Sequence, residues 1–231
     1  MKAENKIPAL IQARMTSKRL PGKSLMNASG KPLLMWVLEA VRSLDFISEP
    51  IVLTSNDSAD DLIQEFCTLH SVKVFRGDRD NVLLRYQKAV EYFQIERFVR
   101  ITADNPFYLN DVSVKAFNTF DSTSADYLHI EGLSHVVPEF LTSKAIDYAV
   151  SKASSSQHLE HVTPVLRERE AQEKITVIQV LNHDIGLESK IDRYLTVDTR
   201  SDFERFSSVI EKGVPRTKQD LYQMIEKINM K

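Results

Sequence analysis

The chain of 231 residues contains only one cysteine, and it has no long hydrophobic run. One cysteine excludes an internal disulfide framework. Cys67 lies in an amphipathic helical stretch, where a buried structural thiol is a more common role than a nucleophile. No apolar run approaches the roughly 20 residues of a membrane span, and no signal-peptide pattern precedes the first apolar run. We therefore expect a cytoplasmic protein with no membrane partner.

Neither sign of charge is in large excess. The sequence has 30 Lys and Arg against 32 Asp and Glu, which gives a formal net charge of −2. Without a global basic field, nucleic acid is not an expected partner, and any anion site must be local. Apolar residues make up 42% of the chain, as in ordinary globular proteins that bury a core.

Apolar runs typical of strands alternate with helical periods through the first 130 residues. The strand-like runs cover residues 8–12, 51–54, 72–75, 98–102 and 126–130. The helical patterns cover residues 33–44, 59–69, 82–93 and 112–120. This alternation predicts βαβ units, and therefore an α/β fold with a mainly parallel sheet covered by helices on both faces.

The pattern changes after residue 130. Two helical patterns follow at 143–153 and 158–169, then strand-like runs at 176–181 and 194–197, and finally a pair of helices. We expect one domain over residues 1–231, with 131–190 as an insertion or lid. Six apolar positions of that segment need not be buried by the sheet: Val136, Val137, Phe140, Leu141, Ile146 and Val150.

A cationic loop follows the first apolar run. Arg14, Lys18, Arg19 and Lys23 fall within ten residues, directly after residues 7–11. A short run of Lys and Arg is often only a solvated loop. Ligands, however, bind outside the carboxyl ends of strands in open parallel sheets, and cationic side chains there suit a polyphosphate. The loop lacks both the dinucleotide-binding GxGxxG pattern and the P-loop pattern, which disfavours those two classes.

Two aspartates follow apolar strand-like runs. Asp104 comes after residues 98–102, and Asp198 directly follows the run 194–197. Asp104 could be a plain turn residue, since Asp-Asn-Pro is common in turns. Asp202 is well explained as a first-turn acid of a helix capped by Thr199 or Ser201, but that explanation does not cover Asp198. Two strand-end carboxylates facing a cationic loop indicate a Mg²⁺ site.

Another loop, residues 75–81, joins a strand-like run to a helical pattern. Gly77 would allow close approach of a base or a ribose. Asp78 and Asp80 are candidates for ligand contact or for plain helix caps, and we favour capping for at least one of them.

Together these segments resemble the CTP-dependent sugar cytidylyltransferases, most nearly the spore-coat-polysaccharide type and more distantly the CMP-sialate and Kdo cytidylyltransferases. The matching segments are residues 12–14, 19–23, 30–33, 82–86, 102–106, 160–164 and 195–199 with Asp202. The resemblance implies a three-layer, Rossmann-like nucleotide-diphospho-sugar transferase sandwich.

The resemblance also implies a reaction and a set of site residues. A sugar or sugar-acid hydroxyl would attack the α-phosphate of CTP and release pyrophosphate, with Mg²⁺ as cofactor. Arg14 and Lys23 would contact the triphosphate, Asp104 and Asp198 would hold the metal, and Gly77 would lie near the cytosine. The full nucleotide set is Gln12, Ala13, Arg14, Arg19, Lys23, Gly77, Asp80 and Arg85, with Arg14, Lys23 and Asp104 as the catalytic residues. Members commonly dimerise through the segment equivalent to 131–170, so we expect a homodimer.

The sequence departs from the family pattern at two places. Asn105 stands where a cysteine usually follows the aspartate, and residues 137–144 lack the usual glycine near the sugar pocket. Two other functions stay open. One is a glycosyltransferase, for which Asp78-Arg79-Asp80 supplies an Asp-x-Asp sequence, and the other is a catalytically silent binding module on the same fold.

Overall fold

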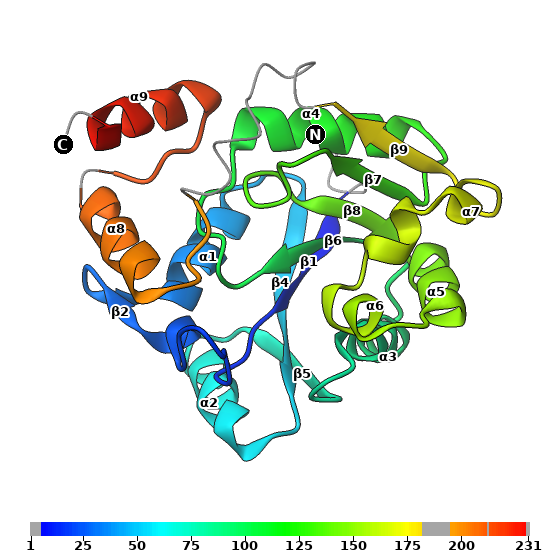
Figure 1. The fold of residues 1–231 in the computed structure, drawn as a ribbon, viewed down its shortest axis with the longest axis horizontal. Helices are drawn as coiled ribbons and strands as arrows, with labels where there is room; N and C mark the ends of the chain where they lie inside the picture. Colours follow the sequence, from blue (N-terminus) through cyan, green and yellow to red (C-terminus); the bar gives the residue numbers. More distant parts are fainter. Residues whose placement is uncertain (1–5, 182–194, 212, 230–231) are drawn as a thin grey trace.

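A seven-stranded sheet lies at the centre of the computed structural model, which describes residues 6–181, 195–211 and 213–229 (Figure 1). The strand order is β5-β4-β1-β6-β8-β7-β9. The strands are β1 (Ile7–Gln12), β4 (Ile47–Ser55), β5 (Lys73–Gly77), β6 (Arg97–Thr102), β7 (Tyr127–Ile130), β8 (Glu139–Thr142) and β9 (Val177–Val180). Only β8 runs antiparallel to its neighbours within this described sheet. The predicted mainly parallel α/β fold is therefore confirmed.

Helices cover both faces of the sheet because the side chains of its strands alternate between two cores. Ala9 and Ile11 of β1 pack into one core, and Leu10 packs into the other. The first core takes α1 (Leu33–Arg42), α2 (Asp61–Leu69), α4 (Asn110–Ser122), α8 (Arg200–Ile210) and α9 (Lys218–Asn229). The second takes α3 (Val82–Phe93) and α5 (Ser143–Lys152), with α6 (Ser156–His161) and α7 (Arg169–Gln172) nearby.

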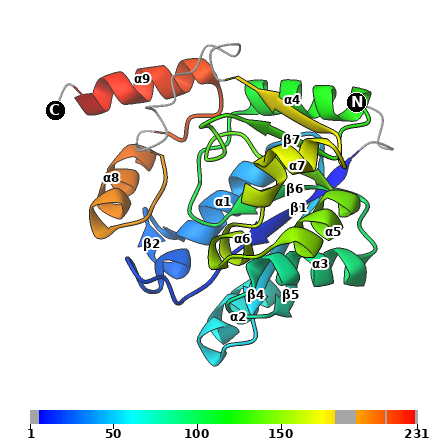
Figure 2. The ribbon, with the colours of Figure 1, turned by 45° about the vertical axis from the view of Figure 1, so that its right-hand side comes forward.

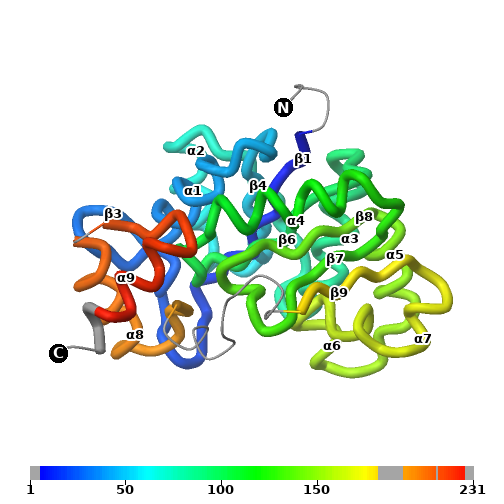
Figure 3. The backbone as a smooth tube through the Cα atoms, turned by 90° about the horizontal axis from the view of Figure 1, so that it is seen from above, coloured from blue at the N-terminus to red at the C-terminus, as the bar shows by residue number. Residues whose placement is uncertain are grey.

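The helices at the two ends of the molecule come from different parts of the chain. Figures 1 and 2 show α3, α5 and α6 grouped on the side opposite α8 and α9. Figure 3 shows α8 and α9 at one end, beside the short hairpin of β2 (Asn27–Ala28) and β3 (Lys31–Pro32). The carboxyl ends of the central strands lie between these two groups.

The order of the strands creates a crossover at β1. The chain first adds β4 and β5 on one side of β1, and then crosses to place β6 on the other side. Gln12 at the end of β1 pairs with Thr102 at the end of β6. The loops that follow these two strands therefore start from adjacent points, which is where open α/β sheets bind ligands.

The segment 131–190 differs from the expected insertion. Its described part supplies β8 and β9 to the central sheet, with Phe98 of β6 opposite Leu141 of β8. Of the six apolar residues that suggested an exposed face, five are buried within the chain and only Val150 is partly exposed. These side chains complete the core of one chain, so they no longer support a dimer interface.

Two further elements were predicted wrongly. The single helix expected at 158–169 is broken, because Val162 has a φ of 71° and Pro164 starts a 3-10 turn, Pro164–Arg167. The strand expected at 194–197 begins outside the described residues, and Leu195 to Val197 form no regular strand. Val197 nevertheless donates its N–H to the Asp104 carbonyl at 3.0 Å, which keeps Asp198 beside Asp104.

Cys67 and Asp202 have the structural roles that the sequence predicts for them. Cys67 is buried, and burial raises the pKa of its thiol to about 12, as expected for a structural residue and not for a nucleophile. Thr199 and Asp202 form a reciprocal capping box at the start of α8. Across the described residues, we find no helix with the length and apolarity that crossing a membrane would require.

Candidate active site

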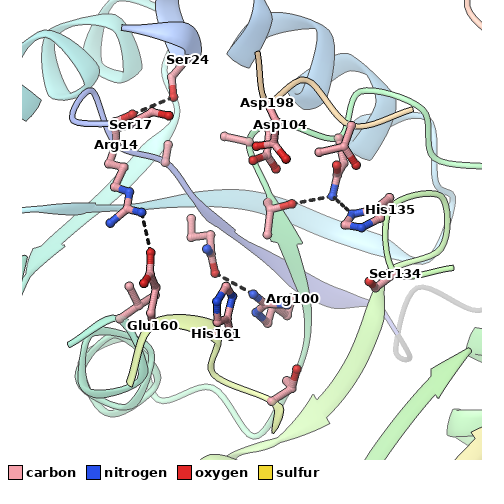
Figure 4. Close-up of a pocket in the computed structure, with 18 of the residues that line it drawn as sticks. Arg14, Ser17, Ser24, Arg100, Asp104, Ser134, His135, Glu160, His161 and Asp198 are labelled. Atoms are coloured by element: carbon pink, nitrogen blue, oxygen red, sulfur yellow. Dashed lines mark hydrogen bonds and ion pairs between the residues drawn. The ribbon is translucent and has the colours of Figure 1, made fainter. Parts of the chain in front are cut away.

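A pocket of about 790 Å³ opens at the carboxyl ends of β1 and β6 (Figure 4). Its walls come from the loops after both strands, from α6 and the turn that follows it, and from the segment before α8. Eight of the sequence-predicted site residues line it: Gln12, Ala13, Arg14, Arg19, Lys23, Arg85, Asp104 and Asp198. The structure thus brings together the predicted phosphate-binding and metal-binding residues.

The loop after β1 is fixed by a buried carboxylate. Asp60 is fully buried, and its Oδ1 accepts the Met15 N–H at 2.7 Å. Its Oδ2 accepts the Ser55 N–H at 3.0 Å and the Ser55 hydroxyl. Among the described residues Asp60 forms no ion pair, so N–H and O–H dipoles stabilise its charge. Sequence reasoning missed this residue, which ties the cationic loop to the end of β4.

The same loop folds back on itself before Lys23. Gly22 has a φ of 74°, a left-handed conformation that favours glycine, and its N–H donates to the Met15 carbonyl at 2.8 Å. The Ser24 hydroxyl donates to the Arg14 carbonyl at 3.1 Å. These bonds hold the loop as a compact turn that presents its cations to the pocket.

Lys23 links the two strand-end aspartates. Its Nζ lies 2.6 Å from Asp104 Oδ2 and 3.1 Å from Asp198 Oδ1, and it donates to the Val197 carbonyl at 3.0 Å. Arg19 Nη2 lies 2.8 Å from the same Oδ1 of Asp198. Burial tends to raise the pKa of Asp104, but the Lys23 ammonium and the Thr102 hydroxyl outweigh it, and the pKa lies below its usual value.

The aspartate pair fits a magnesium ion. Among the described residues, no group of three or more His, Cys, Asp and Glu side chains could hold a metal ion on its own. Mg²⁺ bound with a nucleotide commonly uses one or two carboxylates and takes its other ligands from phosphate and water. Asp104 and Asp198 reach a common cation, the Lys23 ammonium, so their oxygens converge on one point. The donor set therefore suits a metal that arrives with a polyphosphate.

Arg14 lies on the other side of the pocket. Its Nη2 is 2.7 Å from Glu160 Oε1 on α6, and both side chains are substantially exposed. Figure 4 shows this ion pair on the opposite wall of the pocket from Asp104 and Asp198. Glu160 belongs to the segment that supports the family resemblance, but the ion pair itself was not predicted.

A buried ionic network forms part of the pocket that sequence reasoning missed. Glu139 of β8 accepts from Arg100 at 2.5 Å, Arg167 at 2.6 Å, Tyr127 at 2.5 Å and Thr163 at 3.0 Å. Burial tends to raise the pKa of Glu139, but the two guanidinium groups outweigh this effect and lower it to about 2. The sequence does carry one signal for this network. Glu139 lies within the mostly apolar run 136–141, and a glutamate buried with such a run needs a charged or hydrogen-bonding partner.

The network reaches the nucleotide residues through Gln12. Arg100 Nη2 donates to Gln12 Oε1 at 3.0 Å, which fixes the amide at the end of β1. The Arg100 guanidinium is held in turn by Glu139, so the orientation of Gln12 depends on a residue of β8. This coupling could not be read from sequence spacing, because Gln12 and Glu139 lie on different strands far apart in the chain.

Asn105, one departure from the family pattern, has a defined place in the site. It is almost fully buried, and its Nδ2 donates to Thr102 Oγ1 at 2.6 Å and lies 3.0 Å from His135 Nδ1 (Figure 4). Thr102 and His135 both line the pocket. The amide thus joins the end of β6 to the loop that carries His135, a pocket residue that sequence reasoning missed.

Arg85 closes the pocket next to the loop of Gly77. It is 2% exposed and donates to the Asp78 carbonyl from Nε at 2.9 Å and from Nη2 at 2.6 Å. A Cβ on Gly77 would lie 2.8 Å from Arg85 Cγ, so this position needs glycine for close packing.

The acids of that loop do not take their predicted places. The Asp80 side chain is 93% exposed, and neither Gly77 nor Asp80 lines the pocket. Asp78 accepts the N–H groups of Asp80 and Asn81, and Asn81, not an aspartate, caps α3. The Asp-x-Asp sequence therefore stabilises a turn here, which removes the observation that favoured a glycosyltransferase.

Comparison with known proteins shows the family to which this chain belongs. The family model described as Cytidylyltransferase matches residues 8–227. The spore coat polysaccharide biosynthesis protein SpsF of Bacillus subtilis is 30% identical over 234 residues, covering 97% of this chain and 95% of that protein.

Several solved structures share the fold, including the following two. A cytidylyltransferase from Leptospira borgpetersenii superimposes with a TM-score of 0.84 at 26% identity, covering 97% of this chain and 95% of the other. A CMP:2-keto-3-deoxy-manno-octonic acid synthetase complexed with CTP has a TM-score of 0.65 at 16% identity, covering 90% of this chain and all of the other, and shows likeness of fold alone. By the extent of the family match and by its fold, this chain belongs to the cytidylyltransferase family.

Proposed function

We propose that this protein transfers CMP from CTP to a hydroxyl of a sugar or sugar acid, with release of pyrophosphate and with Mg²⁺ as cofactor. The product would serve surface polysaccharide or glycoconjugate synthesis in the cytoplasm. One observation carries the proposal: in a member of the cytidylyltransferase family, the loop cations and two strand-end carboxylates line a single pocket at the β1–β6 crossover. A polyphosphate with a divalent cation fits that arrangement of charge.

The proposed catalytic residues act by position and charge. Arg14, Arg19 and Lys23 would bind the triphosphate and stabilise the negative charge that develops on the leaving pyrophosphate. Asp104 and Asp198 would hold Mg²⁺, which would neutralise charge on the phosphate oxygens. Phosphoryl-type transfer needs little covalent help from a protein, because alignment of the attacking hydroxyl with the α-phosphate supplies much of the acceleration.

The base would lie toward Arg85 and the loop of Gly77. Arg85 holds the backbone carbonyls of Asp78 and Arg79, so it fixes the turn that follows β5. A rigid turn with a buried guanidinium at the pocket wall is suited to recognise the polar edge of a pyrimidine. We therefore propose CTP as the preferred nucleotide.

The acceptor would occupy the part of the pocket near β8 and the turn after α6. Arg167 and Thr163 line this part and are held by Glu139. Gln12, fixed by Arg100, would lie between the acceptor and the nucleotide. These residues offer hydrogen bonds for the hydroxyl or carboxylate groups of a sugar or sugar acid.

The experiment measures pyrophosphate release from each of the four nucleoside triphosphates, with Mg²⁺ and a panel of neutral sugars and sugar acids. We expect release only with CTP and only with some acceptors. Lys23→Ala should reduce kcat/KM for CTP by at least about a hundredfold, through loss of charge-assisted contacts. Lys73→Ala serves as a control, because Lys73 pairs with Glu49 on β4 and does not line the pocket.

Three outcomes would contradict the proposal. Turnover of a nucleotide-sugar donor in place of CTP would indicate a glycosyltransferase. Tight CTP binding with no acceptor turned over by any preparation would indicate a silent binding module. Equal rates for Lys23→Ala and Lys73→Ala would remove the cationic loop from the mechanism.

A further inference from the structure

The ammonium group of Lys23 already has a full set of hydrogen-bond acceptors. An ammonium carries three N–H donors, and Lys23 Nζ is bonded to three oxygens, from Asp104, Asp198 and the Val197 carbonyl. The residue is 9% exposed, so these bonds lie largely out of water. Lys23 has no donor left for a phosphate while this arrangement holds.

Lys23 and a divalent cation would use the same carboxylate oxygens. The contacts of 2.6 Å and 3.1 Å place the ammonium at the point on which the two carboxylates converge. A metal bound to both carboxylates there would lie within a few ångströms of the ammonium, and two cations so close repel strongly in a partly buried site. One cation must leave before the other can bind both carboxylates.

A displaced ammonium needs another anion. Moving the Lys23 charge away from its oxygens without a replacement would leave a desolvated cation unpaired, which is costly. A triphosphate lying along the loop after β1 would supply that anion. Arg19 also pairs with Asp198, but its side chain is 65% exposed, so water can solvate its charge when the pair opens.

We propose that Lys23 competes with the divalent cation for Asp104 and Asp198, so that the metal binds the carboxylate pair tightly only when nucleotide phosphates draw the Lys23 ammonium away. The nucleotide part of this inference rests on the proposed function. Metal and nucleotide binding then favour each other, and because coupling between two sites is reciprocal, each raises the affinity for the other by the same factor. The exchange also gives Lys23 two roles, as partner of the carboxylates without nucleotide and as phosphate ligand with it.

The test uses Mn²⁺ as a spectroscopic probe, because carboxylate and water ligands suit Mn²⁺ as well as Mg²⁺. Free Mn²⁺ is followed by electron paramagnetic resonance during titration into the full-length protein without nucleotide. We expect weak binding to the wild type and binding at least about tenfold tighter to Lys23→Gln. The double variant Lys23→Gln/Asp104→Asn should lose this gain in Mn²⁺ affinity, because it removes one of the two carboxylates.

Lys18→Gln is the matched control. Lys18 also lines the pocket, and none of the described ion pairs joins it to Asp104 or Asp198. The Lys18→Gln substitution therefore removes one positive charge from the pocket, as Lys23→Gln does, but leaves the ion pairs of Asp104 and Asp198 in place. An equal gain in Mn²⁺ affinity for Lys18→Gln and Lys23→Gln would mean that the metal responds only to the net charge of the pocket. That result would overturn the proposed competition between Lys23 and the metal.

The wild-type protein provides an independent test if Lys23→Gln does not fold. Mn²⁺ binding to the wild type without nucleotide, as tight as in the presence of CTP, would overturn the proposal. Failure of the proposed function is a separate result, because it would show as no pyrophosphate release from any nucleotide. The Mn²⁺ titration without nucleotide does not depend on turnover.

Discussion

The guanidinium of Arg14 and the carboxylate of Glu160 lie 2.7 Å apart, although 146 residues separate them in the chain. The pair joins the loop after β1 to helix α6, and the side chain of Arg14 is 39% exposed and that of Glu160 is 49% exposed. A phosphate that binds Arg14 has to replace or share the Glu160 carboxylate. Exposed ion pairs are worth about 1 kcal/mol or less, so this competition is mild.

We predict that Glu160→Gln will tighten CTP binding by about two- to fivefold, the factor that corresponds to such a pair. Isothermal titration calorimetry in the presence of Mg²⁺ measures the Kd for CTP of the wild type and of the variant. Glu168→Gln is the control, because Glu168 pairs with His158 and not with the loop. Weaker CTP binding in Glu160→Gln would show that Glu160 holds Arg14 in its productive position and does not compete with phosphate.

Asp104→Asn and Asp198→Asn should each reduce kcat by at least about a hundredfold, because each removes a charged ligand of the proposed Mg²⁺ site. Their effect on stability should be small, about 1 kcal/mol, since the amide oxygen still accepts a hydrogen bond from Lys23. Asp147→Asn, on the exposed face of α5, is the control for charge loss. Crystals soaked with CTP and Mg²⁺ that place the ion away from both carboxylates would contradict the assignment.

The buried carboxylate of Asp60 should matter for nucleotide binding although it does not line the pocket. Asp60→Asn replaces one acceptor oxygen by an NH₂ group that faces donors, at a cost of about 1–3 kcal/mol. We expect a higher KM for CTP and faster amide hydrogen exchange at Met15, whose N–H it holds. Asp61→Asn is the matched control, because the neighbouring Asp61 side chain is exposed and pairs with Arg76. A loss of stability with an unchanged KM would make Asp60 a structural residue only.

Glu139 should make the protein sensitive to acid. Its pKa is lowered to about 2 in the folded chain from an ordinary 4.5, so its stabilising effect is complete above the ordinary value. The effect is then lost as the pH falls from about 4.5 toward 2. We expect Glu139→Gln to lower the free energy of unfolding by about 3 kcal/mol at pH 7, with a smaller difference from wild type at pH 3.

Urea unfolding at pH 7, 5 and 3 measures this difference. Glu49→Gln is the control, because it removes an exposed partner of Lys73 on the same sheet. A difference between wild type and Glu139→Gln that stays constant from pH 7 to pH 3 would show that the carboxylate charge is not what holds Arg100 and Arg167.

The homodimer is a separate prediction that now rests on the family resemblance. Static light scattering at micromolar concentration should give twice the 26.4 kDa mass of one chain. Five of the apolar side chains first offered for the interface are buried inside the chain, so a dimer would have to use other surfaces. A mass of one chain would reject the dimer and would require that each chain close its own acceptor site.

The sequence alone determined those features that depend on local patterns. Apolar runs predicted β1, β4, β5, β6, β7 and β9, because a buried strand reads as a short apolar run, but they predicted neither β8 nor the hairpin of β2 and β3. The cationic loop and Asp104 were found because functional side chains in parallel sheets gather at carboxyl ends of strands. Asp198 was found in the same way, although the segment before it is not a regular strand.

Only the tertiary structure decided which side chains meet. β8 was missed because its four residues include Glu139 and Thr142, and its strand pairing depends on β6 and β7, not on its own pattern. The Glu139 network, the Asp60 anchor and the three-oxygen site of Lys23 join residues that are distant in the chain. Their energies come from burial and from the low effective dielectric of the interior, and both are properties of the folded chain that no residue carries by itself.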